Sequence, residues 1–233
     1  MAVSAAWQGW GVVCDFDGTI TMRDTAWTML HIFGPPGWKR FEAAFHAGTM
    51  SDQQVVTEQF RLVGTPITEL REWALANTSI RPGAHEFFAW CSQNDLPVTV
   101  ASNGLDFYID AVLQEHDLPT IDVVCGRAEQ RAGWIAVSYE HLKDPTYPLV
   151  QDHKLVAVQR LKARGLKVAY IGDGAPDYAA AAASDLIFAR YRLKERCDAN
   201  GIPYQPFEDF LQIVVAIERG DVLDSVRDRP PSP

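Results

Sequence analysis

Three short apolar segments of the chain each end in a polar loop, and this repeated pattern constrains the fold more than any other feature. The segments cover residues 11–16, 97–101 and 167–171, and the loops after them read DGT (17–19), SNG (102–104) and GDG (172–174). Largely apolar runs of this length are typical of strands that are buried on both faces of a sheet. Helical patterns at 83–93, 105–115, 154–164 and 178–183, and a fourth apolar segment at 186–189, complete the series. The alternation predicts an α/β fold with a Rossmann-like parallel sheet core and helices on both faces.

Residues 24–79 interrupt this alternation. They carry helical patterns at 52–62 and 68–76 but no convincing strand. We therefore predict a helical cap domain at 24–79, inserted after the first strand into a core of residues 1–23 and 80–226.

Two further segments depart from the strand and helix series. Residues 123–126 and 134–139 are short apolar runs separated by a polar stretch, which predicts a β-hairpin. Residues 227–233 are polar and rich in proline, so we predict a disordered tail.

The composition disfavours several classes of partner. The chain of 233 residues has 21 Lys and Arg against 30 Asp and Glu, so its net charge of −9 would not attract nucleic acid or an anionic membrane. No segment approaches the roughly 18 uncharged apolar residues of a membrane span, and we find no export signal. The four cysteines form no C-x-x-C pair, which fits a reducing compartment. We expect a cytoplasmic monomer or homodimer that binds neither nucleic acid nor membranes.

Asp15 and Asp17 stand two residues apart where the first apolar segment ends. Side chains at this spacing on an extended segment can point to the same side. Such a pair can share a cation or divide the roles of nucleophile and general acid/base, although the pattern is also common in ordinary loops. Because parallel sheets bind ligands beyond the carboxyl ends of their strands, we expect the three polar loops to meet in one site.

The remaining motifs each have a structural interpretation beside the functional one. The SNG loop offers a hydroxyl and N–H groups at a helix start, which suit an anion or simply cap the helix. Asp173 and Asp177 add carboxylates after the third strand, although Asp177 alone is typical of a helix cap. Lys154 begins an amphipathic helix and, alone, would be a solvated charge.

In combination the sequences DFDGT (15–19), SNG (102–104), Lys154 and GDGAPD (172–177) are far more specific. Their order and spacing resemble the four motifs of the haloacid dehalogenase superfamily, and the resemblance covers about residues 11–190. It is to the phosphatase branch, because true dehalogenases of this fold lack an aspartate at the position of Asp17. The helical insertion resembles the type 1 cap of phosphoserine phosphatase-like members.

The resemblance implies a Mg²⁺-dependent phosphomonoesterase that acts on a small phosphorylated metabolite. Asp15 would be the nucleophile that forms an aspartyl-phosphate, and Asp17 would be the general acid/base. The implied phosphate-binding residues are Gly18, Thr19, Ser102, Asn103 and Lys154. The implied Mg²⁺ ligands are Asp15, Asp17 through its carbonyl, and Asp173, with Asp177 in a supporting role.

Within this family the cap selects the leaving group. The resemblance leaves two substrate types open, the enediol phosphate of methionine salvage and a phosphoserine-like compound. Arg23, Asp24 and Arg61 are candidates for substrate selection, although an exposed charge of this kind is usually just solvated. Two alternatives to hydrolysis stay open: phosphoryl transfer to an alcohol and, less favoured, a non-catalytic protein that binds a phosphorylated metabolite.

Overall fold

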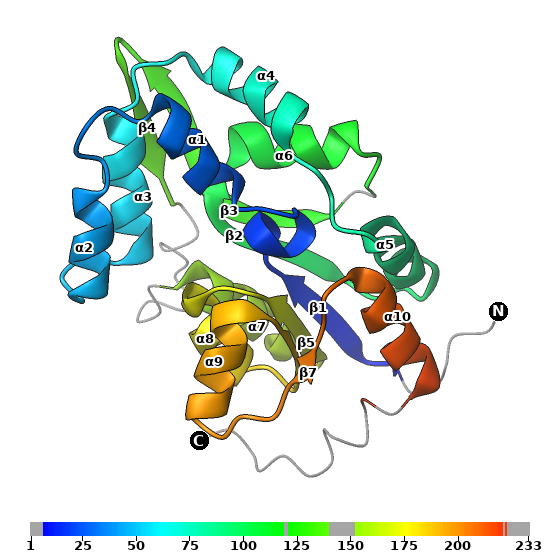
Figure 1. Cartoon of the computed structure of the whole chain (residues 1–233). Helices are drawn as coiled ribbons and strands as arrows, with labels where there is room; N and C mark the ends of the chain where they lie inside the picture. Colours follow the sequence, from blue (N-terminus) through cyan, green and yellow to red (C-terminus); the bar gives the residue numbers. More distant parts are fainter. Residues whose placement is uncertain (1–6, 119–120, 140–151, 221, 223–233) are drawn as a thin grey trace.

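The computed structural model describes residues 7–118, 121–139, 152–220 and 222. Its strands form one seven-stranded sheet in the order β4-β3-β2-β1-β5-β6-β7 (Figure 1). All neighbouring pairs are parallel except β3 and β4, which are antiparallel. The strands are β1 (Trp10–Cys14), β2 (Val98–Leu105), β3 (Asp122–Arg131), β4 (Trp134–Ser138), β5 (Lys167–Gly172), β6 (Leu186–Ala189) and β7 (Gln205–Pro206). The predicted parallel α/β sheet is confirmed.

Helices cover both faces of the sheet because its central strands are apolar on both. In β1, Val12 and Cys14 belong to one buried cluster and Val13 to another, as the alternation of side chains along a strand requires. The helices in the first cluster include α5 (Ala84–Gln93), α6 (Asp106–Glu115) and α10 (Phe210–Arg219). Those in the second are α7 (His153–Ala163), α8 (Tyr178–Ala182) and α9 (Tyr191–Ala199).

Four α-helices lie within residues 24–79, between β1 and α5. They are α1 (Thr25–Phe33), α2 (Arg40–His46), α3 (Asp52–Arg61) and α4 (Ile67–Asn77). Figure 1 shows them, in blue to cyan, gathered beyond the end of β1. Residues 24–79, which the structure describes throughout, contain no strand. Helix α4 packs against α6, and α3 packs against β4.

The chain leaves and re-enters the sheet region through two segments that lie side by side. Thr21 and Ile80 form an isolated antiparallel bridge. On either side of it the Met22 N–H donates to the Ser79 carbonyl at 2.8 Å, and the Arg81 N–H donates to the Ile20 carbonyl at 2.8 Å. The helical insertion is therefore joined to the sheet by two hydrogen-bonded segments around Thr21 and Ile80, here called the paired base.

The predicted hairpin is present, but its first strand is longer than 123–126. Strand β3 pairs in parallel with β2, as in the register of Val100 with Val123, and its second half pairs with β4, as in Arg127 with Ser138. That second half continues in polar, largely exposed residues, so the apolar pattern does not reveal it. The predicted tail at 227–233 lies outside the described residues. No helix in the described part of the chain is long and apolar enough to cross a membrane.

Candidate active site

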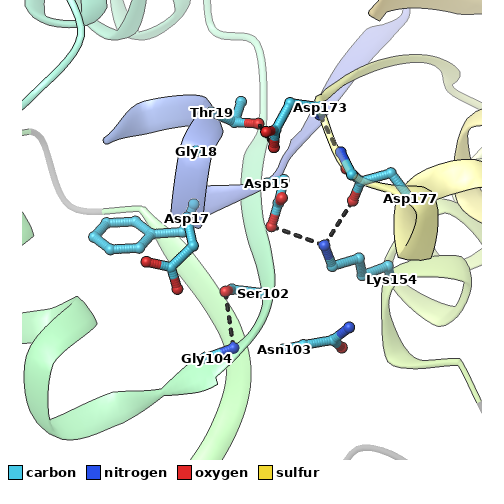
Figure 2. A network of polar contacts seen from close by, with 12 residues as sticks. Asp15, Asp17, Gly18, Thr19, Ser102, Asn103, Gly104, Lys154, Asp173 and Asp177 are labelled. Carbon is cyan, nitrogen blue, oxygen red and sulfur yellow. Dashed lines mark hydrogen bonds and ion pairs between the residues drawn. The ribbon is translucent and has the colours of Figure 1, made fainter. Parts of the chain in front are cut away.

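The three polar segments meet at one edge of the sheet, as the strand order predicts. Residues 102–104, predicted as a loop, lie in β2, because the strand continues through these polar residues to Leu105. Cys14, the last residue of β1, is in register with Val100 of β2 and with Ile171 of β5. Asp15 therefore follows β1 between the segment that contains Ser102 and the loop that contains Asp173 (Figure 2).

A buried cluster of charges forms the centre of this edge. The Lys154 Nζ lies 2.8 Å from Asp15 Oδ1 and 2.6 Å from Asp177 Oδ1, and none of the three side chains is more than 7% exposed. Burial alone would lower the pKa of Lys154, but the two carboxylates outweigh it and raise this pKa. Burial, followed by the charge of Asp177, raises the pKa of Asp15. The ionised Asp15 carboxylate therefore needs more positive charge than Lys154 supplies.

Asp177 uses both of its oxygens to hold other groups in place. Oδ1 accepts from Lys154 and, at 2.7 Å, from the Tyr170 hydroxyl. Oδ2 accepts from the backbone N–H groups of Asp173, at 3.0 Å, and Gly174, at 2.7 Å. Asp177 thus fixes the position of the lysine and the shape of the third loop.

The carboxylates of this cluster fit a hard divalent cation. Asp15, Asp173 and Asp177 each place one oxygen within 4.8 Å of the others. Carboxylate oxygens are the ligands that Mg²⁺ prefers, and four donors already occupy Asp177. Oδ2 of Asp15 and Oδ2 of Asp173 have no hydrogen-bond partner among the described residues. These two oxygens are therefore the ones that could bind a cation.

Gly18 allows Asp173 to approach the loop after β1. Its φ is +78°, and a Cβ added to it would lie 2.6 Å from Asp173 Oδ2. Thr19 donates its hydroxyl to Asp173 Oδ1 at 3.0 Å. Glycine at position 18 is thus required both by the backbone conformation and by the neighbouring carboxylate.

Asp17 points away from the lysine cluster (Figure 2). Its Oδ1 accepts from the Thr25 backbone N–H at 2.8 Å, and its Oδ2 accepts a short hydrogen bond from the Tyr108 hydroxyl. Burial, followed by the charge of Asp24, raises the pKa of Asp17 to about 7. Two carboxylates that stand two residues apart therefore occupy different environments, and Asp17 has a pKa suited to proton transfer near neutral pH.

The backbone of residues 102–104, at the polar end of β2, is held by two side chains from other segments. The Ser102 carbonyl lies 2.7 Å from His153 Nε2, and the Asn103 carbonyl accepts from the Tyr139 hydroxyl at 2.6 Å. The Gly104 N–H donates to Ser102 Oγ at 3.0 Å. Because C=O and N–H point in opposite directions across a trans peptide, fixing the Ser102 carbonyl also fixes the direction of the Asn103 N–H.

Several residues of this edge were not predicted from the sequence. Arg81 is buried, and its guanidinium donates to the carbonyls of Gly18, Thr19 and Thr21, so it shapes the loop that carries Asp17. Tyr108 and Tyr170 are isolated tyrosines without any motif around them. Two signals were present in the sequence: Arg81 stands in the RPG turn before the helical pattern at 83–93, and His153 directly precedes Lys154.

The insertion closes this edge into a cavity of about 730 Å³. Helices α1, α2 and α3 contribute mainly apolar lining residues, among them Trp27, Leu30, Phe45, Val55 and Phe60. At one end of α3 the side chain of Asn103 donates to Asp52 and accepts from Gln53. The cavity thus has one wall from the sheet edge and another from the helical insertion.

The three residues predicted to select the substrate lie in different places. Arg23 and Asp24 line the cavity, and Asp24 Oδ1 also accepts from the Trp27 N–H at 2.8 Å, where it caps α1. Arg61 is exposed and does not line the cavity; its Nη1 lies 3.6 Å from Glu58 Oε2. The structure therefore gives Arg61 no contact through which it could select a substrate.

Comparisons with known proteins agree with this geometry. A family model described as haloacid dehalogenase-like hydrolase matches residues 12–182. Two curated relatives, from Bacillus thuringiensis (strain Al Hakam) and Bacillus cereus (strain AH820), are named 2-hydroxy-3-keto-5-methylthiopentenyl-1-phosphate phosphatase. Each is 31% identical over 204 residues, which cover 85% of this chain and 91% of the relative.

Solved structures of phosphoserine phosphatase share the fold. One is a phospho-aspartyl intermediate analogue with a TM-score of 0.68, and another is a substrate-bound complex with a TM-score of 0.67. Each is 20% identical and covers 88% of this chain and 97% of its own. The chain therefore belongs to the haloacid dehalogenase-like hydrolase family, and within it to the phosphatases.

Proposed function

We propose that this chain is a Mg²⁺-dependent phosphomonoesterase of a small phosphorylated metabolite and that Asp15 carries the phosphoryl group as an aspartyl-phosphate. The observation that carries this proposal is the pairing of Asp15 with Lys154 at 2.8 Å in a cavity of about 730 Å³. A cavity of this volume suits a small molecule. Asp17 lies nearby with a separate set of partners, so the two acids can take two roles.

In the first half-reaction an Asp15 oxygen attacks phosphorus, and the bond from phosphorus to the leaving oxygen breaks. Lys154 neutralises part of the charge on Asp15 and on the phosphate, and Asp177 holds its ammonium in place. Mg²⁺, held by Asp15, Asp173 and the carbonyl of Asp17, would supply the positive charge that lets a carboxylate approach a phosphate dianion. Without that charge, repulsion would keep the two anions apart.

Asp17 serves as general acid and then as general base. Its carboxyl gives a proton to the leaving oxygen, and the resulting carboxylate takes a proton from the water that attacks the aspartyl-phosphate. A pKa of about 7 suits both steps, since neither form is strongly disfavoured near neutral pH. The hydrogen bonds from Thr25 and Tyr108 hold the carboxyl in place.

The phosphate oxygens would be held by the hydroxyl of Ser102, the amide of Asn103, the Gly18 segment and Lys154. Ser102 Oγ accepts from the Gly104 N–H, which leaves its own hydrogen free to donate to a phosphate oxygen. The Thr19 hydroxyl donates to Asp173 and so orders the proposed cation ligand, which leaves the Thr19 backbone N–H as its donor to the phosphate.

We also propose that residues 24–79 act as a cap domain on a core of residues 1–23 and 80–226. The paired base at Thr21 and Ile80 leaves two short junctions, about 21–25 and 78–82, at which the cap can turn. The contacts of Asp52 and Gln53 with Asn103 would form when the cap closes over bound phosphate. Closure would keep bulk water from the aspartyl-phosphate until the leaving group departs.

For the substrate we favour 2-hydroxy-3-keto-5-methylthiopentenyl-1-phosphate over a phosphoserine-like compound. Relatives that are 31% identical carry the name of a phosphatase for this molecule. Its methylthio end is apolar, as are the cavity side chains of Trp27, Leu30 and Phe45. The cap part of the lining has three carboxylates, one histidine and no arginine, which disfavours a carboxylate on the leaving group.

The test is phosphate release from p-nitrophenyl phosphate with Mg²⁺ by the wild type and by Asp15→Asn. We expect turnover by the wild type and none by the variant, because an amide cannot act as the nucleophile. Asp117→Asn is the matched control, since Asp117 is exposed and adopts a positive φ that asparagine tolerates. Equal activity of Asp15→Asn and wild type would contradict the proposal. Addition of glycerol separates hydrolysis, which yields free phosphate, from transfer, which yields glycerol phosphate.

A further inference from the structure

Gln59 is a buried polar side chain that faces the cavity without a partner. It is 4% exposed and lines the cavity. Its backbone carbonyl accepts from the Leu62 N–H, but its side-chain amide has no hydrogen bond to any described residue. Neither amide atom is among the described buried polar atoms that lack a hydrogen-bond partner, so the amide is open to the cavity. An amide that faces a cavity and has no protein partner can bind a ligand directly.

The position of Gln59 places its amide on the leaving-group side of the cavity. Cavity-lining residues of α3 fall at positions 52, 55, 56, 59 and 60, the spacing of one helix face. Asp52, at the start of this face, contacts Asn103 of the phosphate-binding loop. Phe60, at its other end, packs against Phe107, the neighbour of Tyr108, which donates to Asp17. The face therefore runs from the phosphate toward the residue proposed to protonate the leaving oxygen.

The chemistry of an amide limits what it can recognise. Gln59 offers two N–H donors and a carbonyl acceptor but no charge, which matches a neutral group that has both a hydroxyl and a carbonyl oxygen. An ammonium or a carboxylate of the substrate would instead require a charged partner to offset its desolvation. The excess of carboxylates over positive charges on the cap lining adds repulsion against a carboxylate on the leaving group.

We propose that Gln59 is a specificity-determining residue whose amide binds the neutral hydroxyl and keto oxygens of the leaving group, so that the enzyme selects hydroxy-keto phosphates over phosphorylated amino acids. This inference rests on the proposed phosphatase function. It assigns the choice of substrate to an uncharged cap residue, whereas the charged Arg61 lies outside the cavity.

The test compares kcat/KM of the wild type and of Gln59→Leu on two substrates with Mg²⁺. One is 2-hydroxy-3-keto-5-methylthiopentenyl-1-phosphate, and the other is p-nitrophenyl phosphate, whose leaving group has neither a hydroxyl beyond the ester oxygen nor a keto group. We expect kcat/KM to fall about 10- to 100-fold on the first, because two neutral hydrogen bonds are lost, and to stay within about twofold on the second. Gln114→Leu makes the same chemical change on the exposed surface of α6 and should alter neither value.

A melting temperature measured on the same variants separates recognition from a structural role. Because Gln59→Leu removes no hydrogen bond to a described residue, its Tm should stay close to that of the wild type. A lower Tm with equal losses on both substrates would overturn the inference, as would unchanged kcat/KM on the hydroxy-keto substrate. Efficient turnover of phosphoserine by the wild type would overturn it as well.

The activity of the wild type alone tests the proposed phosphatase function. Absence of phosphate release from p-nitrophenyl phosphate by the wild type would contradict that function. Release by the wild type together with a uniform effect of Gln59→Leu would contradict only the role of Gln59.

Discussion

The two walls of the cavity differ in how tightly their polar groups are held. The core wall is formed by the loops after β1 and β5, the polar end of β2 and Lys154. On it, Asp177 accepts four hydrogen bonds and Lys154 contacts two carboxylates. On the cap wall, formed by α1, α2 and α3, Gln59 has no side-chain partner among the described residues and Trp27 is half-exposed. The polar groups of the core wall are thus held by protein partners before any substrate binds. On the cap wall, the Gln59 amide is left to form hydrogen bonds with the substrate.

This difference suits a division of labour between chemistry and recognition. Phosphoryl transfer is the same for every phosphate ester, so the groups that perform it can be fixed by their neighbours in advance. The leaving group varies, and it is met by a wall whose side chains have few partners. Changes to the core wall should therefore affect all substrates, and changes to the cap wall should affect one substrate more than another.

Removal of divalent cations should have the largest effect. Chelation with EDTA is expected to abolish phosphate release from every substrate, because Asp15 and Asp173 would then repel the phosphate dianion with only Lys154 to offset them. Phosphate release before chelation, after chelation and after Mg²⁺ is added back measures this effect. Full activity in EDTA would show that the core wall does not need the cation.

Lys154→Met should reduce both activity and stability. We expect kcat to fall about 100- to 1,000-fold on all substrates, the cost of removing one preorganised electrostatic contact. The free energy of unfolding without Mg²⁺ should fall by about 3–5 kcal/mol, because the buried carboxylates of Asp15 and Asp177 lose their partner. Steady-state kinetics and urea unfolding measure the two effects. Lys162→Met is the control, since this half-exposed lysine pairs with Asp185 at 3.5 Å.

His153→Ala should have an intermediate effect on activity. It should weaken binding of the phosphate group and leave the selection of the leaving group unchanged. Loss of the hydrogen bond to the Ser102 carbonyl frees the peptide that aims the Asn103 N–H. We expect about tenfold weaker inhibition by inorganic phosphate, the scale of one or two hydrogen bonds, and the same loss in kcat/KM for all substrates. Partial recovery in His153→Gln, which keeps a donor, would support positioning of the loop. A loss that depends on the leaving group would place His153 with the cap wall instead.

Trp27→Ala should have the smallest effect and the most selective one. Trp27 is 50% exposed, so the free energy of unfolding should change by no more than about 1 kcal/mol. Its ring lines the cavity, so we expect kcat/KM to fall a few-fold for a substrate with an apolar tail and to stay unchanged for glycerol phosphate. Equal losses of kcat/KM on both substrates would contradict the claim that the cap wall, unlike the core wall, discriminates between substrates.

The sequence predicted the core wall much better than the cap wall. The apolar runs of β1, β2 and β5 mark buried strands, and parallel strands bring their carboxyl ends together, so the meeting of the three loops follows from the pattern. The extended ends of β2 and β3 were missed because polar residues continue those strands. Roles for Asp15, Asp17 and Asp173 came from the resemblance and stay proposals for this chain.

The partners of the proposed catalytic groups could not be predicted from the sequence, for a physical reason. Tyr108 and Tyr139 reach Asp17 and Asn103 from segments 91 and 36 residues away, and no local periodicity reports such pairings. Arg61 shows a second limit, because the sequence does not reveal which way its side chain points. It follows Phe60 directly, and a single step along an α-helix turns a side chain by about 100°, from the cavity to solvent.

The most direct test of the account is to find the phosphoryl group on Asp15 itself. Wild-type protein is quenched with acid during turnover of p-nitrophenyl phosphate and reduced with borohydride, which converts an aspartyl-phosphate to homoserine. Peptide mass spectrometry then reads position 15. We predict homoserine at position 15 in protein quenched during turnover and unmodified aspartate there in protein without substrate. Phosphate release with no homoserine at position 15 would contradict the central claim.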